Sequence, residues 1–255
     1  MNASTASYNL VIIGASGRMG RSLLQQLPRF PALRLHGAVV SPGSGLLGRD
    51  SGEVAGLSPT GVPITAHLEA ALPGAAIALD FSTSASAAER IQICAATGVP
   101  LLLGTTGLGS GVTAALTEAA RRIPVLVAAN TSHGAAVLMD LVRQATGALG
   151  ASFDVSVRDL HHRGKRDAPS GTALALGAAV QEASGTPGQI QYTSVRGGDV
   201  VGQHEVLFLG EGESLRLVHE ATDRSIFARG ALRAGLWLVR QAPGRYQISD
   251  LFQEK

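Results

Sequence analysis

The fold of the N-terminal half of this chain is decided by the stretch Asn9-Leu10-Val11-Ile12-Ile13-Gly14-Ala15-Ser16-Gly17-Arg18-Met19-Gly20. Its apolar run, which ends at Ile13, predicts a buried parallel strand. Residues 21–27 predict a helix that ends before Pro28. A strand, a glycine-rich turn and a helix in this order are typical of a dinucleotide-binding unit, in which a pyrophosphate rests on the helix N-terminus. The spacing is G-x-x-G-x-x-G rather than G-x-G-x-x-G, so a glycine-rich turn without a ligand is the alternative.

The residues that follow repeat the alternation of strand and helix as far as residue 129. Residues 41–60 are rich in Gly and Ser and are predicted to form a surface loop. The pattern predicts a parallel sheet with helices on both faces, in which ligands bind beyond the carboxyl ends of the strands. Strands are predicted at residues 33–40, 62–64, 77–82, 99–103 and 125–129, and helices at residues 67–72, 85–96 and 112–121.

The second half of the chain has a different pattern. Gly210-Glu211-Gly212-Glu213 between two alternating stretches predicts a hairpin, and strands joined by turns predict an open mixed sheet. One face of such a sheet is exposed unless a partner covers it, which predicts a homo-oligomer. The helix at residues 227–240 is predicted to pack back on the first domain. Other helices are predicted at residues 135–149 and 173–180, and strands at residues 153–160, 190–195, 202–209 and 214–221.

The predicted fold class is therefore α/β, with two domains. A Rossmann-like parallel-sheet dinucleotide-binding domain is expected at residues 1–132 and 230–255. An α+β domain with an open mixed sheet, for substrate binding and oligomerisation, is expected at residues 133–229. The two connections near Ser132 and Gly230 would act as a paired hinge.

A stretch dense in reactive side chains runs from Asp159 to Thr172. It holds His161, His162 and Lys165 ahead of a Pro-Ser-Gly-Thr turn, in which Ser170 or Thr172 can cap the following helix. Backbone N–H groups at a helix start attract anions, and the lysine and histidines add charge and proton-transfer capacity. We interpret the stretch as a site that binds an anionic substrate and protonates it. A solvated basic loop is the alternative. A metal site is not expected, because adjacent histidines on a strand point in opposite directions.

Composition excludes several other classes. The 255 residues are 45% hydrophobic and 16% charged, so a packed core is expected and disorder is not. Cations are spread along the chain without aromatic interleaving, so no nucleic-acid partner is expected. The single Cys94, the lack of a signal-peptide pattern and the lack of a long apolar run predict a soluble cytoplasmic protein without a membrane partner.

The expected cofactor is NADPH, NADH or both. At the end of the second predicted strand, Ser41-Pro42-Gly43-Ser44 offers neither the acid that often binds NAD ribose hydroxyls nor an arginine. Arg18 can meet a 2′-phosphate, which favours NADPH, with use of both cofactors expected.

Together these stretches resemble the 4-hydroxy-tetrahydrodipicolinate reductase family, also called dihydrodipicolinate reductases, of lysine and diaminopimelate biosynthesis. The family pattern H-H-x-x-K-x-D-x-P-S-G-T is met in full from His161 to Thr172. The other matching stretches are Gly14 to Gly20, Asp80-Phe81-Ser82, Gly104-Thr105-Thr106-Gly107, Ala129-Asn130 and Phe227-Ala228-Arg229-Gly230-Ala231.

The resemblance implies a homotetramer joined through the substrate-domain sheets, and hydride transfer from NAD(P)H to C4 of a cyclic dicarboxylate to give tetrahydrodipicolinate. It makes His161 the active-site histidine and Lys165 the general acid, although which of the two gives the proton stays open. It implies that His162, Lys165, Gly171 and Thr172 bind the substrate carboxylates. The cofactor residues that it implies are Gly14, Arg18, Met19, Phe81, Gly104, Thr106, Ala129 and Asn130, with Arg224 matching a family arginine near the hinge. The glycine turn and the strand ends add Ser16, Gly17, Ser41 and Thr105 to the expected cofactor site, and Arg224 is expected to contact the cofactor as well.

Two positions depart from the family pattern. Ser41 stands where many members carry an acid, and Thr131 where an aromatic residue often stands. The rival interpretations are another two-domain NAD(P)-dependent reductase of an amino-acid precursor and a nucleotide-sensing regulatory module without catalysis. Neither is favoured, because the first lacks the His-His-x-x-Lys block and the second has no need of Lys165.

Overall fold

A computed structural model describes residues 7–105, 108–184 and 190–252. It divides the chain into two compact units, residues 1–131 with 227–255 and residues 132–226. We call these the first unit and the second unit. Their boundaries lie one and three residues before those expected from the sequence.

The first unit contains one seven-stranded sheet, and every pair of neighbouring strands in it is parallel. Its order is β11-β6-β5-β4-β1-β2-β3, so the order reverses between β1 and β4, where a crevice for ligands forms in such sheets. The predicted parallel sheet is confirmed. The strands are β1 (Tyr8–Ile13), β2 (Leu33–Val39), β3 (Ile64–Thr65), β4 (Ile77–Asp80), β5 (Leu101–Leu103), β6 (Pro124–Val127) and β11 (Gly244–Tyr246).

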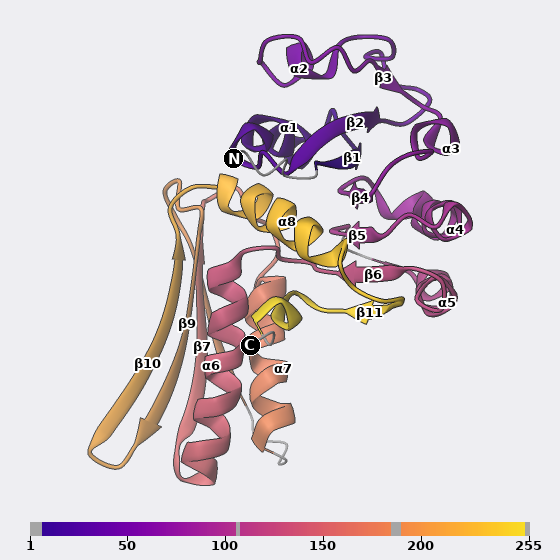
Figure 1. The fold of residues 1–255 in the computed structure, drawn as a ribbon. Helices are drawn as coiled ribbons and strands as arrows, with labels where there is room; N and C mark the ends of the chain where they lie inside the picture. Colours follow the sequence, from indigo (N-terminus) through magenta and orange to yellow (C-terminus); the bar gives the residue numbers. More distant parts are fainter. Residues whose placement is uncertain (1–6, 106–107, 185–189, 253–255) are drawn as a thin grey trace, which may run out of the picture. The chain divides into compact units, whose positions relative to one another are not determined.

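Helices cover both faces of this sheet, as predicted. Three helices lie on one face, namely α3 (Leu68–Ala71), α4 (Ala87–Thr97) and α5 (Ser110–Ala119), while α1 (Arg18–Gln26) and α8 (Ser225–Leu238) lie on the other (Figure 1). The short helix α2 (Ser51–Val54) lies inside the segment predicted as a loop. It forms because the Asp50 carboxylate caps it, accepting hydrogen bonds from the Gly52 N–H at 2.8 Å and the Glu53 N–H at 3.3 Å. The same carboxylate also accepts from the Gly61 N–H at 2.8 Å, beyond the helix.

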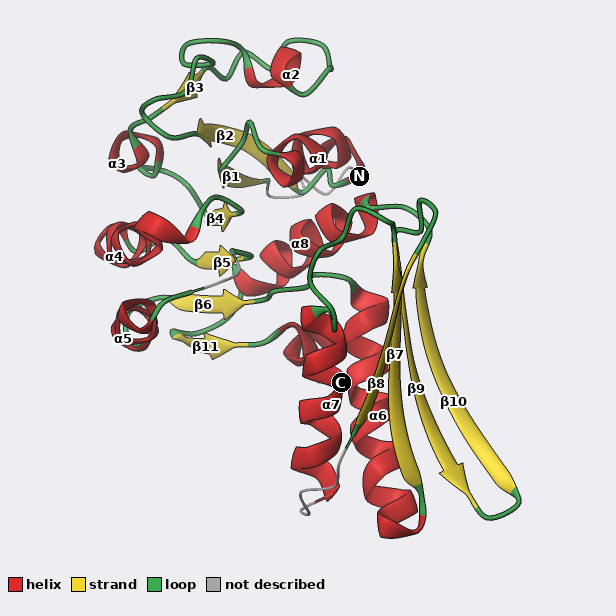
Figure 2. Ribbon diagram, turned by 180° about the vertical axis from the view of Figure 1, so that it is seen from behind, coloured by secondary structure: helices red, strands yellow, loops and turns green. Residues whose placement is uncertain are grey.

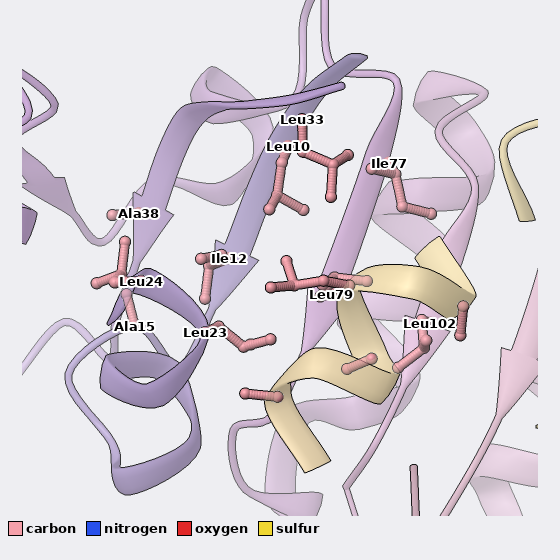
Figure 3. Close-up of a cluster of buried hydrophobic side chains, with 14 of the residues drawn as sticks. Leu10, Ile12, Ala15, Leu23, Leu24, Leu33, Ala38, Ile77, Leu79 and Leu102 are labelled. Atoms are coloured by element: carbon pink, nitrogen blue, oxygen red, sulfur yellow. The ribbon is translucent and has the colours of Figure 1, made fainter. Parts of the chain in front are cut away.

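The alternation along β1 divides the core between the two faces. Leu10 and Ile12 are buried with Leu23 of α1 and with the apolar face of α8, whereas Val11 and Ile13 belong to the cluster on the opposite face (Figure 3). Each fully buried leucine contributes about 2 kcal/mol relative to an exposed one. The prediction that the helix at residues 227–240 packs on the first domain is confirmed, because five α8 residues join this core: Ala228, Ala231, Leu232, Ala234 and Leu238.

The second unit is a four-stranded mixed sheet with two helices on one face, α6 (His133–Leu149) and α7 (Gly171–Ser184) (Figure 2). The strand order is β10-β9-β7-β8, in which only β7 and β8 pair in parallel among the pairs found. The predicted open mixed sheet and its hairpin are confirmed, with Gly210 opposite Glu213. The strands are β7 (Asp154–His161), β8 (Gln191–Arg196), β9 (Gly202–Gly210) and β10 (Glu213–Ala221).

The two faces of this mixed sheet differ in burial. Val157, Val206 and Phe208 are buried toward the helices, while Val195, Leu209 and Val218 are exposed on the opposite face.

None of the helices in the described ranges combines the length and hydropathy that a bilayer-crossing segment needs.

Candidate active site

The glycine-rich turn after β1 is built from backbone atoms in close contact. Gly14 has φ +83°, and a Cβ there would lie 2.8 Å from the carbonyl oxygen of Phe81. At Gly20 a Cβ would lie 2.2 Å from the Gly14 carbonyl oxygen, so α1 begins directly against the turn. Gly17, which precedes α1, is exposed. This cradle of bare backbone at a helix N-terminus fits a pyrophosphate, which is the group that the fold implies there.

The loops after β4 and β5 meet beside this turn. A Cβ on Gly104 would lie 2.0 Å from the Phe81 ring, so the ring lies against the Gly104 backbone. Thr105 Oγ1 donates to the Ser82 carbonyl oxygen at 3.4 Å. The structure therefore brings together Phe81, Gly104 and Thr105 next to Gly14, as expected for strand ends at the switch point.

The buried carboxylate of Asp80 holds the loop after β4. It accepts hydrogen bonds from the Ser82 N–H at 2.9 Å and from Arg90 Nε at 2.7 Å. Arg90 also donates to the Thr83 carbonyl oxygen at 2.6 Å. From the sequence, Asp80 was only part of a motif, and its role as the anchor of the Phe81 loop appears only in the structure.

The remaining residues expected at the cofactor are more scattered. Ser16 and Met19 are half-buried in the turn and in α1, whereas Arg18 and Ser41 are exposed. Ala129 and Asn130 follow β6 at the same edge of the sheet, and Thr106 lies outside the described residues. Arg224 is exposed and belongs to the second unit.

Thr131 is one of the two positions that depart from the pattern of the family that the sequence resembles. Its side chain is buried, and its Oγ1 donates to the Phe227 carbonyl oxygen at 2.7 Å. Thr131 ends the N-terminal segment of the first unit and Phe227 begins its C-terminal segment. The hydroxyl therefore ties together the two points at which the chain leaves and re-enters this unit.

In the second unit, β7 ends at His161 and leads into the histidine loop, which we define as residues 161–172. The His161 imidazole is buried, and Gly202 leaves room for it, because a Cβ there would lie 3.0 Å from His161 Nε2. Burial first, and the nearby positive charge of Lys165 second, lower the pKa of His161 below its ordinary value. His161 is therefore a neutral imidazole at neutral pH.

We call residues 161–163, which follow β7, the outgoing side of the loop, and residues 165–172, which lead into α7, its return side. Lys165 lies on the return side. Its Nζ donates to both carboxylate oxygens of Asp167, at 2.8 and 2.7 Å, and its side chain is 23% exposed. The Asp167 side chain is 58% exposed, so this ion pair contributes little to stability and can exchange with another carboxylate.

The start of α7 completes the loop. Ser170 rather than Thr172 caps the helix, because Ser170 Oγ accepts from the Ala173 N–H at 3.2 Å. Gly171 is exposed and Thr172 is half-buried at this helix start, and His162 is half-buried at the beginning of the loop. The second unit thus places an ammonium group and a helix N-terminus on one short loop, which suits a ligand with carboxylate groups.

Two family models match the chain. The model described as "Dihydrodipicolinate reductase, N-terminus" matches residues 8–131, and "Dihydrodipicolinate reductase, C-terminus" matches residues 134–252. The chain belongs to the dihydrodipicolinate reductase family. The resemblance drawn from the sequence is confirmed.

Relatives extend over nearly the whole chain. The 4-hydroxy-tetrahydrodipicolinate reductase of Anaeromyxobacter dehalogenans (strain 2CP-C) is 43% identical over 95% of this chain and 96% of its own length. That of Thiobacillus denitrificans (strain ATCC 25259 / T1) is 41% identical over 96% and 98%. A dihydrodipicolinate reductase from Paenisporosarcina sp. TG-14, solved with dipicolinate bound, has a TM-score of 0.78 at 23% identity over 94% of this chain and 97% of that chain. The last likeness shows the shared fold.

In this member of the dihydrodipicolinate reductase family, three histidines form a row that was not predicted from the sequence, with His161 and His204 buried and His219 half-buried. His204 of β9 lies edge-on to His161, with ring centroids 5.1 Å apart, and stacks on His219 of β10 at 6.5 Å. His204 Nε2 lies 3.1 Å from Ser170 Oγ. Alternation along β9 puts His204 on the buried face with Val206, which was the available signal. Among the described residues, no group of His, Cys, Asp and Glu is arranged to hold a metal ion.

These histidines predict a dependence of stability on pH. Burial first, and the neighbouring His161 second, lower the pKa of His204 to about 4. Because its pKa is about 6.5 in the unfolded chain, the unfolded state binds more protons between these values. We expect the free energy of unfolding to fall by roughly 2 kcal/mol from pH 6.5 to pH 5 through His204. Its contribution is fully present above pH 6.5.

Urea unfolding followed by circular dichroism at both pH values tests this expectation. The variant His204→Gln should show a shallower loss of stability on acidification, while the matched variant His67→Gln, at an exposed histidine, should keep the wild-type slope. An unchanged slope in His204→Gln would contradict the assignment.

Proposed function

We propose that this chain reduces 4-hydroxy-tetrahydrodipicolinate to tetrahydrodipicolinate with NAD(P)H, in lysine and diaminopimelate biosynthesis. The observation that carries the proposal is membership of the reductase family over both units, with the loop from His161 to Thr172 intact. Fold alone would not choose this substrate, because an amine dehydrogenase from Mycobacterium smegmatis has a TM-score of 0.69 at 14% identity.

The first unit would bind the cofactor. Gly14, Ser16, Gly17, Arg18 and Met19 would hold the pyrophosphate at the start of α1. A bound reduced nicotinamide supplies the hydride that adds to C4 of the substrate. The residues proposed to line the rest of the cofactor site are Ser41, Phe81, Gly104, Thr105, Thr106, Ala129, Asn130 and Arg224.

The proposal includes use of both NADPH and NADH. Arg18 is exposed and cationic, which suits a 2′-phosphate, while the Ser41 hydroxyl can hydrogen-bond either a phosphate or a ribose hydroxyl. Neither residue carries a charge that would repel one of the two cofactors.

The second unit would bind the cyclic dicarboxylate. His162, Lys165 and the helix start at Gly171 and Thr172 would hold its carboxylates, with one of them displacing Asp167 from Lys165. Hydride addition leaves negative charge on the conjugated system, which a nearby cation stabilises and a proton donor neutralises. We assign that proton to Lys165 Nζ, because the lowered pKa of His161 leaves its imidazole without an extra proton at neutral pH.

Steady-state kinetics test the proposal most directly. The absorbance of NADPH and NADH should fall when freshly generated substrate is added, and should stay constant with aspartate semialdehyde or aspartyl phosphate, which are the oxidised substrates of the rival reductases. Cofactor binding without any turnover would support the rival regulatory module instead.

We also propose a homotetramer joined through the mixed sheets, in the cytoplasm, where the unpaired Cys94 stays reduced. The exposed side chains of Val195, Leu209 and Val218 on one sheet face support an interface there. Sedimentation equilibrium should give four times the 26.1 kDa chain mass. An active monomer at micromolar concentration would contradict this part.

A further inference from the structure

A buried ion pair lies beneath the histidine loop. The Asp159 side chain is 0% exposed, and its two oxygens accept from Arg196 Nη1 and Nη2, each at 3.1 Å. Parallel pairing of β7 with β8 sets Arg196 opposite His161, two residues beyond Asp159. Burial would raise the pKa of Asp159, but hydrogen bonds from Arg196, Ser194 and Ser170 outweigh it and hold the pKa well below its ordinary range. The pair is therefore ionised and bidentate.

The same two side chains hold the return side of the loop. Arg196 Nη2 donates to the Asp167 carbonyl oxygen at 2.6 Å, and Asp159 Oδ2 accepts from the Ser170 N–H at 2.9 Å. Asp167 lies two residues after Lys165, and Ser170 is the cap of α7. One ion pair thus anchors both the segment that carries Lys165 and the helix start.

A second contact fixes the outgoing side. The Arg163 N–H donates to the Gly198 carbonyl oxygen at 3.1 Å, in the turn that follows β8. Both sides of the loop therefore depend on β8, which carries Arg196. The side chains of the Lys165–Asp167 pair itself are partly exposed, although the Lys165 N–H donates to the His162 carbonyl oxygen at 3.1 Å.

We propose that Asp159 and Arg196 are positioning residues, which hold the Lys165 segment and the α7 start at the separation that the two carboxylates of a rigid cyclic substrate require. The inference rests on the proposed function and names residues that act through the loop rather than on the substrate. A rigid ligand cannot adjust to displaced binding groups, so displacement by about 1 Å lowers kcat/KM by up to about 100-fold.

The test is Asp159→Asn, which keeps the side-chain shape and removes the charge that Arg196 needs. We expect KM for the cyclic dicarboxylate to rise about 10- to 100-fold, while KM for NADH stays within about twofold, because its proposed residues lie mainly in the first unit. Asp140→Asn is the matched control, because it makes the same chemical change at the Asp140–Arg143 pair on α6. It should leave both constants unchanged.

Two further variants separate positioning from general loss of structure. Arg196→Lys keeps one positive charge and should show a smaller rise in substrate KM than Arg196→Met. The double variant Asp159→Asn/Arg196→Met should be no worse than the worse single variant, because both changes break one unit. Wild-type KM in Asp159→Asn, or equal rises in both KM values, would overturn the inference. A wild-type protein that does not turn over the substrate would overturn the proposed function instead.

Discussion

Replacing Lys165 by alanine is expected to lower kcat by about 10²–10⁴-fold. The ammonium group would supply both the proton and the positive charge that stabilises the product of hydride addition, and the described part of the loop offers no other partly buried ammonium beside His161. Stopped-flow and steady-state measurements with saturating NADPH and substrate would check the value. Saturation matters because the same residue is proposed to bind a carboxylate, so KM should rise as well.

Two variants make this test selective. Arg166→Ala removes one positive charge from the same loop at an exposed side chain and should change kcat by less than about threefold. His161→Gln asks whether the neutral imidazole is needed for proton transfer. A near-normal kcat in Lys165→Ala, together with a large loss of kcat in His161→Gln, would make His161 the proton donor instead of Lys165.

Gly20→Ala is expected to have the second largest effect. Its Cβ would lie 2.2 Å from the Gly14 carbonyl oxygen and 2.6 Å from the Ala15 carbonyl carbon, and backbone atoms cannot rotate away as a flexible side chain does. Moving α1 away from the turn should lower the free energy of unfolding by about 3 kcal/mol. It should also raise the Kd for NADH on the order of 10-fold, because the cradle is made of these backbone groups.

The control for Gly20→Ala is Gly111→Ala in the first turn of α5, where a Cβ meets nothing within 4 Å. That variant should be as stable as the wild type or more stable, since alanine favours helix over glycine. Isothermal titration with NADH and urea unfolding measure the two quantities. Wild-type NADH affinity in Gly20→Ala would argue against pyrophosphate binding at this turn.

Local patterns predicted most elements of this fold, and the exceptions depend on distant contacts. Helix α2 lies in a segment rich in Gly and Ser, and it forms because Asp50 also binds the backbone of Thr60 and Gly61. Strand β11 has only three residues, Gly244–Tyr246, with no periodicity to reveal them. It exists because β6 offers a free edge for parallel pairing.

For the candidate site, the sequence predicted which residues take part but not all of the contacts between them. The sequence placed Gly14, Phe81 and Gly104 at strand ends, and the shared edge of a parallel sheet brings such ends together. It also placed His161 and Lys165 on one loop. It did not reveal that Asp167 would meet Lys165, and alternation along β9 indicated only that His204 is buried, not that it packs against His161. Side-chain direction in a loop and neighbours across a sheet are set by contacts outside the loop.

The order of strands, turns and helices, the glycine cradle and the family membership are determined by the sequence itself, since each depends on residues close together in the chain. The tertiary structure alone decided which charges meet. Asp159 and Arg196 are 37 positions apart, and only the register between β7 and β8 sets them side by side beneath the histidine loop. Register depends on how whole strands pair and pack, so no local pattern could have revealed the ion pair on which the position of Lys165 is proposed to depend.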